Sequence, residues 1–241
     1  MLSYDVVRGT ETRLTPSLNS DFGGRWLPGG RSIVYSGVES ALPMPHRLDL
    51  DTGKSEVLLR PTGFQEASDV SPDGRMLAYG QLTPGGDRAA WTLPLVGGGP
   101  PVRMLPPGIR AGGARFSPDG RYLAFLSSES GTSEAYVAPY PGPGERVRLS
   151  TGGASALCWP RGSNEILYDS VDGKVVSVPM RTAPQLQLGT PRALFTLNSD
   201  GSWPDFDVTP DGQRILAVVP RVDASQLPLT IVVNWPQAVG R

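Results

Sequence analysis

Short runs of apolar, strand-favouring residues alternate with turn residues along the whole chain. The run 121–126, which reads Arg-Tyr-Leu-Ala-Phe-Leu, is nearly continuously apolar, as expected of a strand that is buried on both faces. The longest stretches without Gly or Pro, 121–130 and 163–172, are only ten residues long. Because a mean globular helix has about 11–12 residues, this pattern predicts an all-β protein.

A segment of ten residues recurs five times, at 26–35, 70–79, 116–125, 159–168 and 208–217. Each copy has a Pro near its start and a Gly two residues later, and successive prolines of the set are 42 to 50 residues apart. A period of this size fits the roughly 40–50-residue blades of β-propellers.

The centre of the repeated segment is a turn sequence, Ser-Pro-Asp-Gly, at 71–74 and 117–120. Pro fixes φ at the first turn position, Asp hydrogen-bonds to the local backbone, and Gly accepts a positive φ. Strand-favouring residues on both sides predict a β-hairpin. In the third unit a third strand at 134–138, a turn at 141–144 and a fourth strand at 146–150 follow, which completes a four-stranded blade.

We therefore predict an all-β protein, a β-propeller of four-stranded antiparallel blades, as a single domain over 1–241. The predicted repeats are 1–15 (an N-terminal half blade), 16–60, 61–106, 107–151, 152–196 and 197–241. The expected total of about 21 strands lies between the roughly 20 of a five-blade ring and the roughly 24 of a six-blade ring. Either the strand near Arg13 completes the last of five blades, or the chain is the C-terminal part of a larger propeller.

Composition and charge argue against several kinds of partner and site. The formal net charge of −1 does not favour nucleic acid as a partner. The longest apolar run, 215–219, is far shorter than the roughly 20 residues of a transmembrane helix, and residues 1–5 do not read as a secretory signal. The single cysteine, Cys158, excludes an internal disulfide and a cysteine-based zinc site, and its apolar surroundings predict a buried, inert thiol.

The signature Ser-Pro-Asp-Gly-Arg-x-Leu-Ala-Tyr/Phe, at 71–79 and 117–125, resembles the repeats of bacterial TolB-like propellers, also called WD40-like or PD40 repeats. The second half also resembles the C-terminal propellers of bacterial serine/threonine kinases, through Ala-Tyr-Val-Ala-Pro-Tyr-Pro-Gly-Pro-Gly at 135–144 and Ile-Val-Val-Asn-Trp at 231–235. The sequence has no Gly-rich loop after a strand and no catalytic-loop His-Arg-Asp, and the Asp-Phe-Gly at 21–23 stands without these other kinase signatures. This resemblance therefore implies a sensory or docking role. It also implies a periplasmic or extracytoplasmic location, whereas a chain that is complete as given is expected in the cytoplasm.

The sequence assembles no catalytic or metal site, so we expect no enzyme activity, no cofactor and no metal. His46 is the only histidine, which excludes histidine-rich metal sites, and it is expected to be a surface or packing residue. Residues 49–53 read as a tight turn with solvated carboxylates. Asp205 and Asp207 share one face of a predicted inner strand, where they line a channel, and paired carboxylates can serve a metal or acid–base chemistry.

The aromatic residues divide into core and binding positions. Trp26, Phe116 and Trp159 occupy equivalent places just before the hairpin, and we predict that they are core residues. Binding residues concentrate on loops held by a rigid scaffold, and aromatic and Arg side chains dominate binding energies. Four residues in the loops that join one blade to the next are the predicted binding residues: Phe22, Phe64, Arg110 and Trp203.

The leading functional hypothesis is a non-enzymatic recognition or scaffold module that binds a protein, peptide or small ligand through its loop rim. The complete repeat set and the lack of a catalytic constellation motivate this hypothesis. The first alternative is a detached C-terminal sensor propeller of a bacterial serine/threonine kinase. The second is a metal-dependent hydrolase or lyase that uses channel carboxylates such as Asp205 and Asp207.

Overall fold

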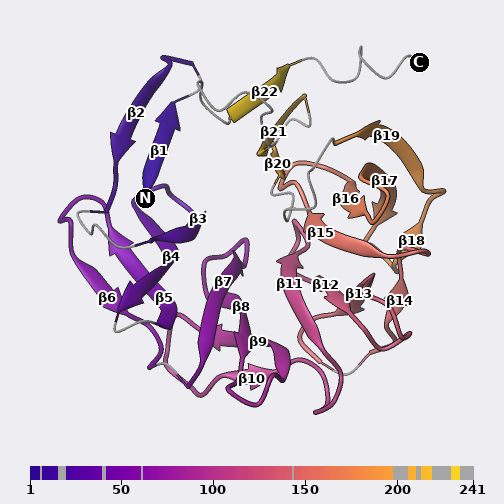
Figure 1. The fold of residues 1–241 in the computed structure, drawn as a ribbon, viewed down its shortest axis with the longest axis horizontal. Helices are drawn as coiled ribbons and strands as arrows, with labels where there is room; N and C mark the ends of the chain where they lie inside the picture. Colours follow the sequence, from indigo (N-terminus) through magenta and orange to yellow (C-terminus); the bar gives the residue numbers. More distant parts are fainter. Residues whose placement is uncertain are drawn as a thin grey trace. The chain divides into compact units, whose positions relative to one another are not determined.

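The computed structural model describes residues 1–5, 7–15, 20–39, 42–60, 62–142, 144–197, 206–209, 213–218 and 229–233. These residues form strands β1 to β22 and no helix, so none of them forms a helix that could span a membrane. The chain divides into two compact units, Met1–Gly112 and Gly113–Arg241, and each is described by itself (Figure 1).

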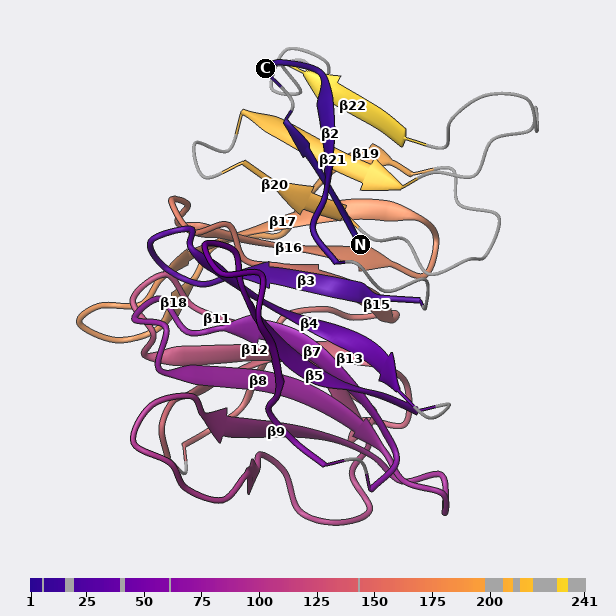
Figure 2. The same ribbon diagram turned by 90° about the vertical axis from the view of Figure 1, so that its left-hand side faces the viewer.

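The first unit contains a two-stranded hairpin and two four-stranded antiparallel sheets. The hairpin pairs β1 (Leu2–Asp5) with β2 (Thr10–Arg13). The next sheet has the order β3 (Phe22–Trp26), β4 (Ser32–Glu39), β5 (Leu42–Asp49) and β6 (Ser55–Val57). The third has the order β7 (Phe64–Val70), β8 (Met76–Leu82), β9 (Arg88–Pro94) and β10 (Val102–Arg103). Figure 2 shows β7, β8 and β9 running side by side.

The second unit continues the same architecture, beginning with β11 at the boundary between the units. Its first sheet has the order β11 (Ala111–Phe116), β12 (Tyr122–Ser127), β13 (Glu134–Pro139) and β14 (Val147–Arg148). Its second contains β15 (Ala154–Cys158), β16 (Glu165–Ser170), β17 (Lys174–Arg181), β18 (Gln187–Leu188) and β19 (Arg192–Thr196). Its third contains β20 (Phe206–Val208), β21 (Arg214–Val218) and β22 (Leu229–Val233).

Strands adjacent in sequence pair with each other in every sheet, as the repeat predicts, except for β18 and β19, which both pair with β17. The fourth repeat has one strand more than expected because its outer strand is divided in two. β17 pairs with β18 through Met180 and Arg181, and with β19 through residues 174–177. The break between β18 and β19 contains Pro191, which has no N–H to donate to the ladder.

The Ser-Pro-Asp-Gly turn forms the predicted hairpin through hydrogen bonds among its own residues. The Ser71 hydroxyl donates to Asp73 Oδ1 at 2.5 Å and accepts from the Met76 N–H at 2.9 Å. The Arg75 N–H donates to the same Asp73 oxygen at 3.0 Å, and Gly74 has a φ of +72°. The Ser117 hydroxyl donates to Asp119 Oδ1 in the same way at 2.6 Å. Both copies of the motif are therefore held by hydrogen bonds among their own residues.

Packing between neighbouring sheets explains the nearly continuous apolar runs. In β16, Leu167 and Tyr168 are consecutive residues, and their side chains belong to different hydrophobic clusters. Tyr168 packs with Tyr122 and other residues of the preceding sheet, whereas Leu167 packs with Phe206 of the following sheet. Because successive side chains of a strand point to opposite faces, β16 is covered on both sides. His46 is also a packing residue: it is 3% exposed and stacks on Tyr35 with ring centroids 5.2 Å apart.

The core prediction holds for two of the three aromatic residues at the repeated position and is wrong for Trp26. Phe116 and Trp159 are buried, but Trp26 is 54% exposed. Trp26 pairs with Ile33, so both side chains share a face of the sheet. The cluster on that face adds Met1 and Leu14 to Ile33. Met1 and Leu14 flank the two-stranded hairpin, and the Trp26 side chain lies outside this cluster.

Candidate functional site

Two of the predicted binding residues lie together in the first unit. Phe22 and Phe64 are the first residues of β3 and β7, one step inside the strands rather than in the loops where the sequence placed them. Their ring centroids are 6.2 Å apart with an interplanar angle of 31°. Phe64 remains 38% exposed, so the pair presents aromatic surface to solvent.

Leu82 extends this aromatic surface. It is the last residue of β8 and the register partner of Phe64, so the two side chains share a face of the sheet. Leu82 is 37% exposed. We call Phe22, Phe64 and Leu82 the rim patch. Exposed apolar side chains that gather at one place mark interaction sites more often than isolated ones do.

An ion pair borders the rim patch on the same face. Glu66 lies two residues after Phe64, and Arg88 is the register partner of Leu82. Glu66 Oε2 and Arg88 Nη2 are 3.7 Å apart, and both side chains are about 40% exposed. At this separation and exposure the pair is weak, because solvent screens the attraction.

Arg110 directly precedes β11. A Cβ built on Gly112 would be 3.2 Å from Arg88 Nε, so the backbone at Gly112 runs directly beside the Arg88 guanidinium. Arg110 is exposed and lies two residues before Gly112. Within the residues that the structure describes, no hydrogen bond or ion pair holds its guanidinium. The chain thus brings the backbone two residues after Arg110 beside Arg88.

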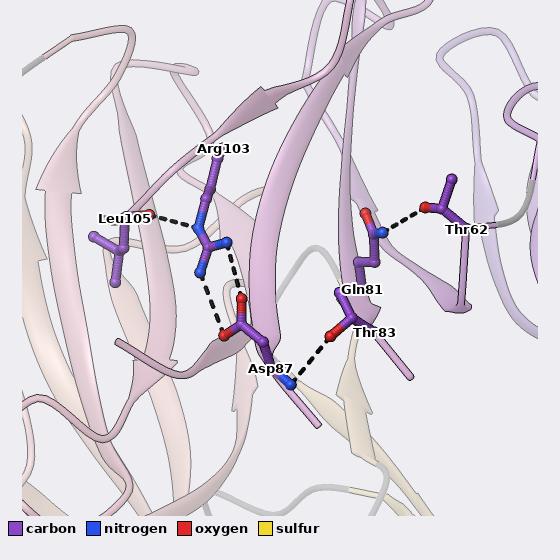
Figure 3. A network of polar contacts seen from close by, with 6 residues as sticks. All are labelled: Thr62, Gln81, Thr83, Asp87, Arg103 and Leu105. Atoms are coloured by element: carbon purple, nitrogen blue, oxygen red, sulfur yellow. Dashed lines mark hydrogen bonds and ion pairs between the residues drawn. The ribbon is translucent and has the colours of Figure 1, made fainter. Parts of the chain in front are cut away.

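A polar network holds the loop between β8 and β9 next to the rim patch (Figure 3). Arg103 donates to both carboxylate oxygens of Asp87, at 3.0 and 3.4 Å, and to the Leu105 carbonyl at 2.8 Å. The Asp87 N–H donates to Thr83 Oγ1 at 3.2 Å. Asp87 and Arg103 therefore form an ion pair with two hydrogen bonds. The network holds the end of β8, which carries Leu82, and the start of β9, which carries Arg88.

The second unit holds the remaining candidate chemistry. Cys158 is 4% exposed and its thiol donates to Asp207 Oδ1 at 3.3 Å. The predicted burial of Cys158 is confirmed. Burial raises the pKa of the Cys158 thiol far above its ordinary value, and the Asp207 charge raises it further, which keeps the thiol protonated. Asp207 itself is exposed on β20. Trp203 and Asp205 lie outside the described residues. The described residues contain no group of three His, Cys, Asp or Glu side chains that could hold a metal.

The sequence predicts Phe22, Phe64 and Arg110 as binding residues, and these stay predictions; it does not point to Leu82, Glu66 or Arg88, which lie beside Phe64 in the structure. Counting the hairpin register outward from the turn at 71–74 comes within one residue of the observed partner of Phe64. A regular hairpin that pairs Val70 with Leu77 would place Phe64 opposite Thr83. A register shift between Ala67 and Asp69 moves the partner of Phe64 to Leu82.

Comparison with known proteins gives few relatives by sequence. No family model matches the chain. An uncharacterised protein of Agrobacterium fabrum (strain C58) is 32% identical over 71 residues, which are 30% of this chain and 24% of that protein.

Solved structures match far more of the chain. TolB from Acinetobacter baumannii aligns with a TM-score of 0.74 at 20% identity, over 97% of this chain and 56% of the TolB chain. An oligogalacturonate lyase in complex with manganese aligns with a TM-score of 0.62 at 17% identity, over 100% of this chain and 72% of the lyase. A β-propeller domain from Myceliophteria thermophila aligns with a TM-score of 0.62 at 11% identity, over 96% of this chain and 75% of that domain.

This chain therefore spans little more than half of the TolB chain. At these identities the likeness is one of fold, and it confirms the architecture expected from the repeats. The chain has the fold of a β-propeller of four-stranded antiparallel blades, and it is similar in fold to TolB and to the Myceliophteria thermophila propeller domain.

Proposed function

We propose that this chain is a recognition module without catalytic activity, which binds a protein or peptide through the rim patch. The observation that carries the proposal is the exposed contact between Phe22 and Phe64, two aromatic side chains from different sheets. A contact of this kind contributes about 0.5–1.5 kcal/mol beyond the buried area, so the rings are held in place before a partner arrives.

The scaffold beneath the rim patch supports a binding role. Each residue of the patch is the terminal residue of a strand, and the strands are fixed by sheet hydrogen bonds. Rigid aromatic side chains lose little conformational entropy on binding and are frequent hot spots. An incoming apolar side chain would therefore gain buried area without ordering a loop.

The two alternatives from the sequence differ in how they relate to this proposal. A sensor propeller of a serine/threonine kinase would also need a recognition surface, so it stays a prediction, as does the extracytoplasmic location. The metal-dependent hydrolase or lyase relies on Asp205 and Asp207. Asp207 shares its Oδ1 with the Cys158 thiol and the Val208 N–H, and nothing in the described part of the chain favours a metal there.

A peptide-display selection against the purified chain tests the proposal. We expect peptides to be enriched whose binding is lost in Phe22→Ala and Phe64→Ala, while both variants keep the wild-type unfolding transition. Trp26→Ala is the matched control, because Trp26 is an exposed aromatic at the opposite end of β3 from Phe22. No enriched peptide, or peptides that need Trp26 instead, would overturn the proposal.

A further inference from the structure

A β-bulge turns Arg25 to the side of its sheet that carries Phe22. The two residues are three positions apart on β3, so regular alternation would place their side chains on opposite faces. The register shift between them changes this, because Phe22 pairs with Ser36 and Arg25 pairs with Val34. Ser36 and Val34 are two residues apart on β4, so Phe22 and Arg25 share one face. Bulges that re-aim a side chain in this way are frequent beside functional sites.

Two backbone carbonyls hold the half-buried side chain of Arg25. Its Nε donates to the Ser68 carbonyl at 2.7 Å, and its Nη1 donates to the Gly24 carbonyl at 3.3 Å. Ser68 lies on β7, at the register shift between Ala67 and Asp69, so the bulges of the two strands meet at Arg25. These bonds fix the guanidinium. They leave its Nη2 amino group without a hydrogen bond to any residue that the structure describes.

Among the described residues, no carboxylate lies within ion-pair distance of Arg25. Ala67 belongs to the cluster that joins its sheet to the sheet of β3, whereas Glu66 and Asp69 lie on the opposite face of β7, as their register partners show. Asp21 is buried and 3.8 Å from the amino group of the N-terminus. A half-buried guanidinium without a counter-charge favours an anionic ligand, because an unpaired charge is costly to remove from water.

The spacing between the aromatic pair and Arg25 suits a terminal amino acid. Residues 23 and 24 are both half-buried glycines, so β3 itself places no side chain between Phe22 and Arg25. Because the register partners of these two residues are two positions apart, they are separated by about 7 Å along the strand. The last residue of a peptide carries its side chain and its α-carboxylate on the same Cα, which matches a separation of this size.

We propose that the rim patch and Arg25 bind the C-terminal end of a peptide. The apolar side chain of its last residue packs on Phe22 and Phe64, and its α-carboxylate accepts hydrogen bonds from the Arg25 guanidinium. Charge-assisted hydrogen bonds between these groups are among the strong ones in proteins. This inference rests on the proposed function and adds the chemical class of its ligand.

The test titrates three acetylated probes into the full chain and follows binding by NMR. The probes are Gly-Gly-Phe with a free carboxylate, its C-terminal amide, and the amide of Gly-Gly-Phe-Asp, whose carboxylate is a side chain. We expect the free carboxylate to bind about tenfold or more tightly than either amide. In Arg25→Gln this preference should vanish, and Phe64→Ala should weaken all binding. Arg31→Gln is the control, because Arg31 is exposed and pairs with Asp51.

The outcomes separate this inference from the proposed function. Equal binding of the free carboxylate and its amide, both dependent on Phe64, would keep the recognition role and overturn the carboxylate site. Equal binding of the Asp probe and the free carboxylate would overturn the choice of the terminus. If no probe binds, the inference also fails, and the peptide selection still tests the recognition role. Should Arg25→Gln unfold the chain, Arg25→Lys, which keeps the charge but not the planar fork, should retain only part of the preference.

Discussion

The buried carboxylate of Glu134 accepts a hydrogen bond from the hydroxyl of Ser150, sixteen residues further along the chain. The other oxygen of Glu134 accepts the Gly152 N–H at 3.0 Å, and Ser150 Oγ accepts the Ala135 N–H at 2.8 Å. Glu134 is 3% exposed. Its hydrogen bonds to Ser150 and Gly152 hold the segment that follows β14 against the start of β13.

Removing this carboxylate is expected to destabilise the protein. Glu134→Ala leaves a hydroxyl and a backbone N–H without an acceptor in a buried place, which should lower the free energy of unfolding by about 2–4 kcal/mol. Urea denaturation of the full chain measures this change in the free energy of unfolding. Glu129→Ala is the control, because Glu129 pairs with the partly exposed Arg146, and its loss should cost less than about 1 kcal/mol. Equal losses would contradict the structural role of Glu134.

Equivalent repeat positions should differ sharply in their contribution to stability. Phe116 is fully buried whereas Trp26 is 54% exposed, although each residue directly precedes the hairpin turn of its own repeat. Phe116→Ala should lower the free energy of unfolding by about 3–5 kcal/mol, and Trp26→Ala by less than about 1 kcal/mol. Thermal unfolding of both variants checks this. Similar losses would show that Trp26 is covered.

The turn motif should make stability depend on pH in the acidic range. A hydrogen bond from the Ser71 hydroxyl, and then one from the Arg75 N–H, hold the pKa of Asp73 below its ordinary value of 3.8. The ionised carboxylate therefore stabilises the fold above about pH 4, and this stabilisation is lost as the pH falls through the folded-state pKa.

Asp73→Asn should accordingly be less stable than wild type at neutral pH, and the difference should shrink towards about pH 2. Chemical denaturation at both pH values measures it. Asp51→Asn serves as the comparison, since Asp51 is exposed and its Oδ2 is 3.5 Å from the exposed Arg31 Nη1. A difference for Asp73→Asn that does not change with pH would refute the assignment.

Cys158 should be chemically silent in the folded protein. Its thiol is buried and held protonated chiefly by burial, so thiol reagents should react only after unfolding. Asp207→Asn should leave the thiol unreactive, because it removes the smaller of the two causes. Labelling kinetics with and without denaturant decide the point. Rapid labelling of the native chain would mean that β15 opens to solvent.

The sequence predicts the sheets well because the hydrogen bonds that hold each Ser-Pro-Asp-Gly turn come from residues of the turn itself. Ser71, Asp73 and Gly74 close the hairpin within a few residues, so no distant contact is needed to define it. The outer strand divided around Pro191 escapes prediction, since it depends on how both halves pair with β17.

The candidate site is less predictable because it depends on register and on neighbours. Residue type and loop position predict Phe64 and Arg110, but the pairing of Phe64 with Leu82 follows from a register shift that the sequence pattern does not indicate. Likewise, Trp26 occupies the same repeat position as Phe116 and Trp159, yet it is exposed and lies outside the cluster that contains Ile33.

The central claim is that a partner binds at the rim patch of the first unit. A photoreactive phenylalanine analogue placed at position 64, and in a separate chain at position 26, tests it most directly. With peptides selected against the wild-type chain, we expect covalent adducts from position 64 and none above background from position 26. Adducts from position 26 alone, or equal yields from both, would contradict the claim.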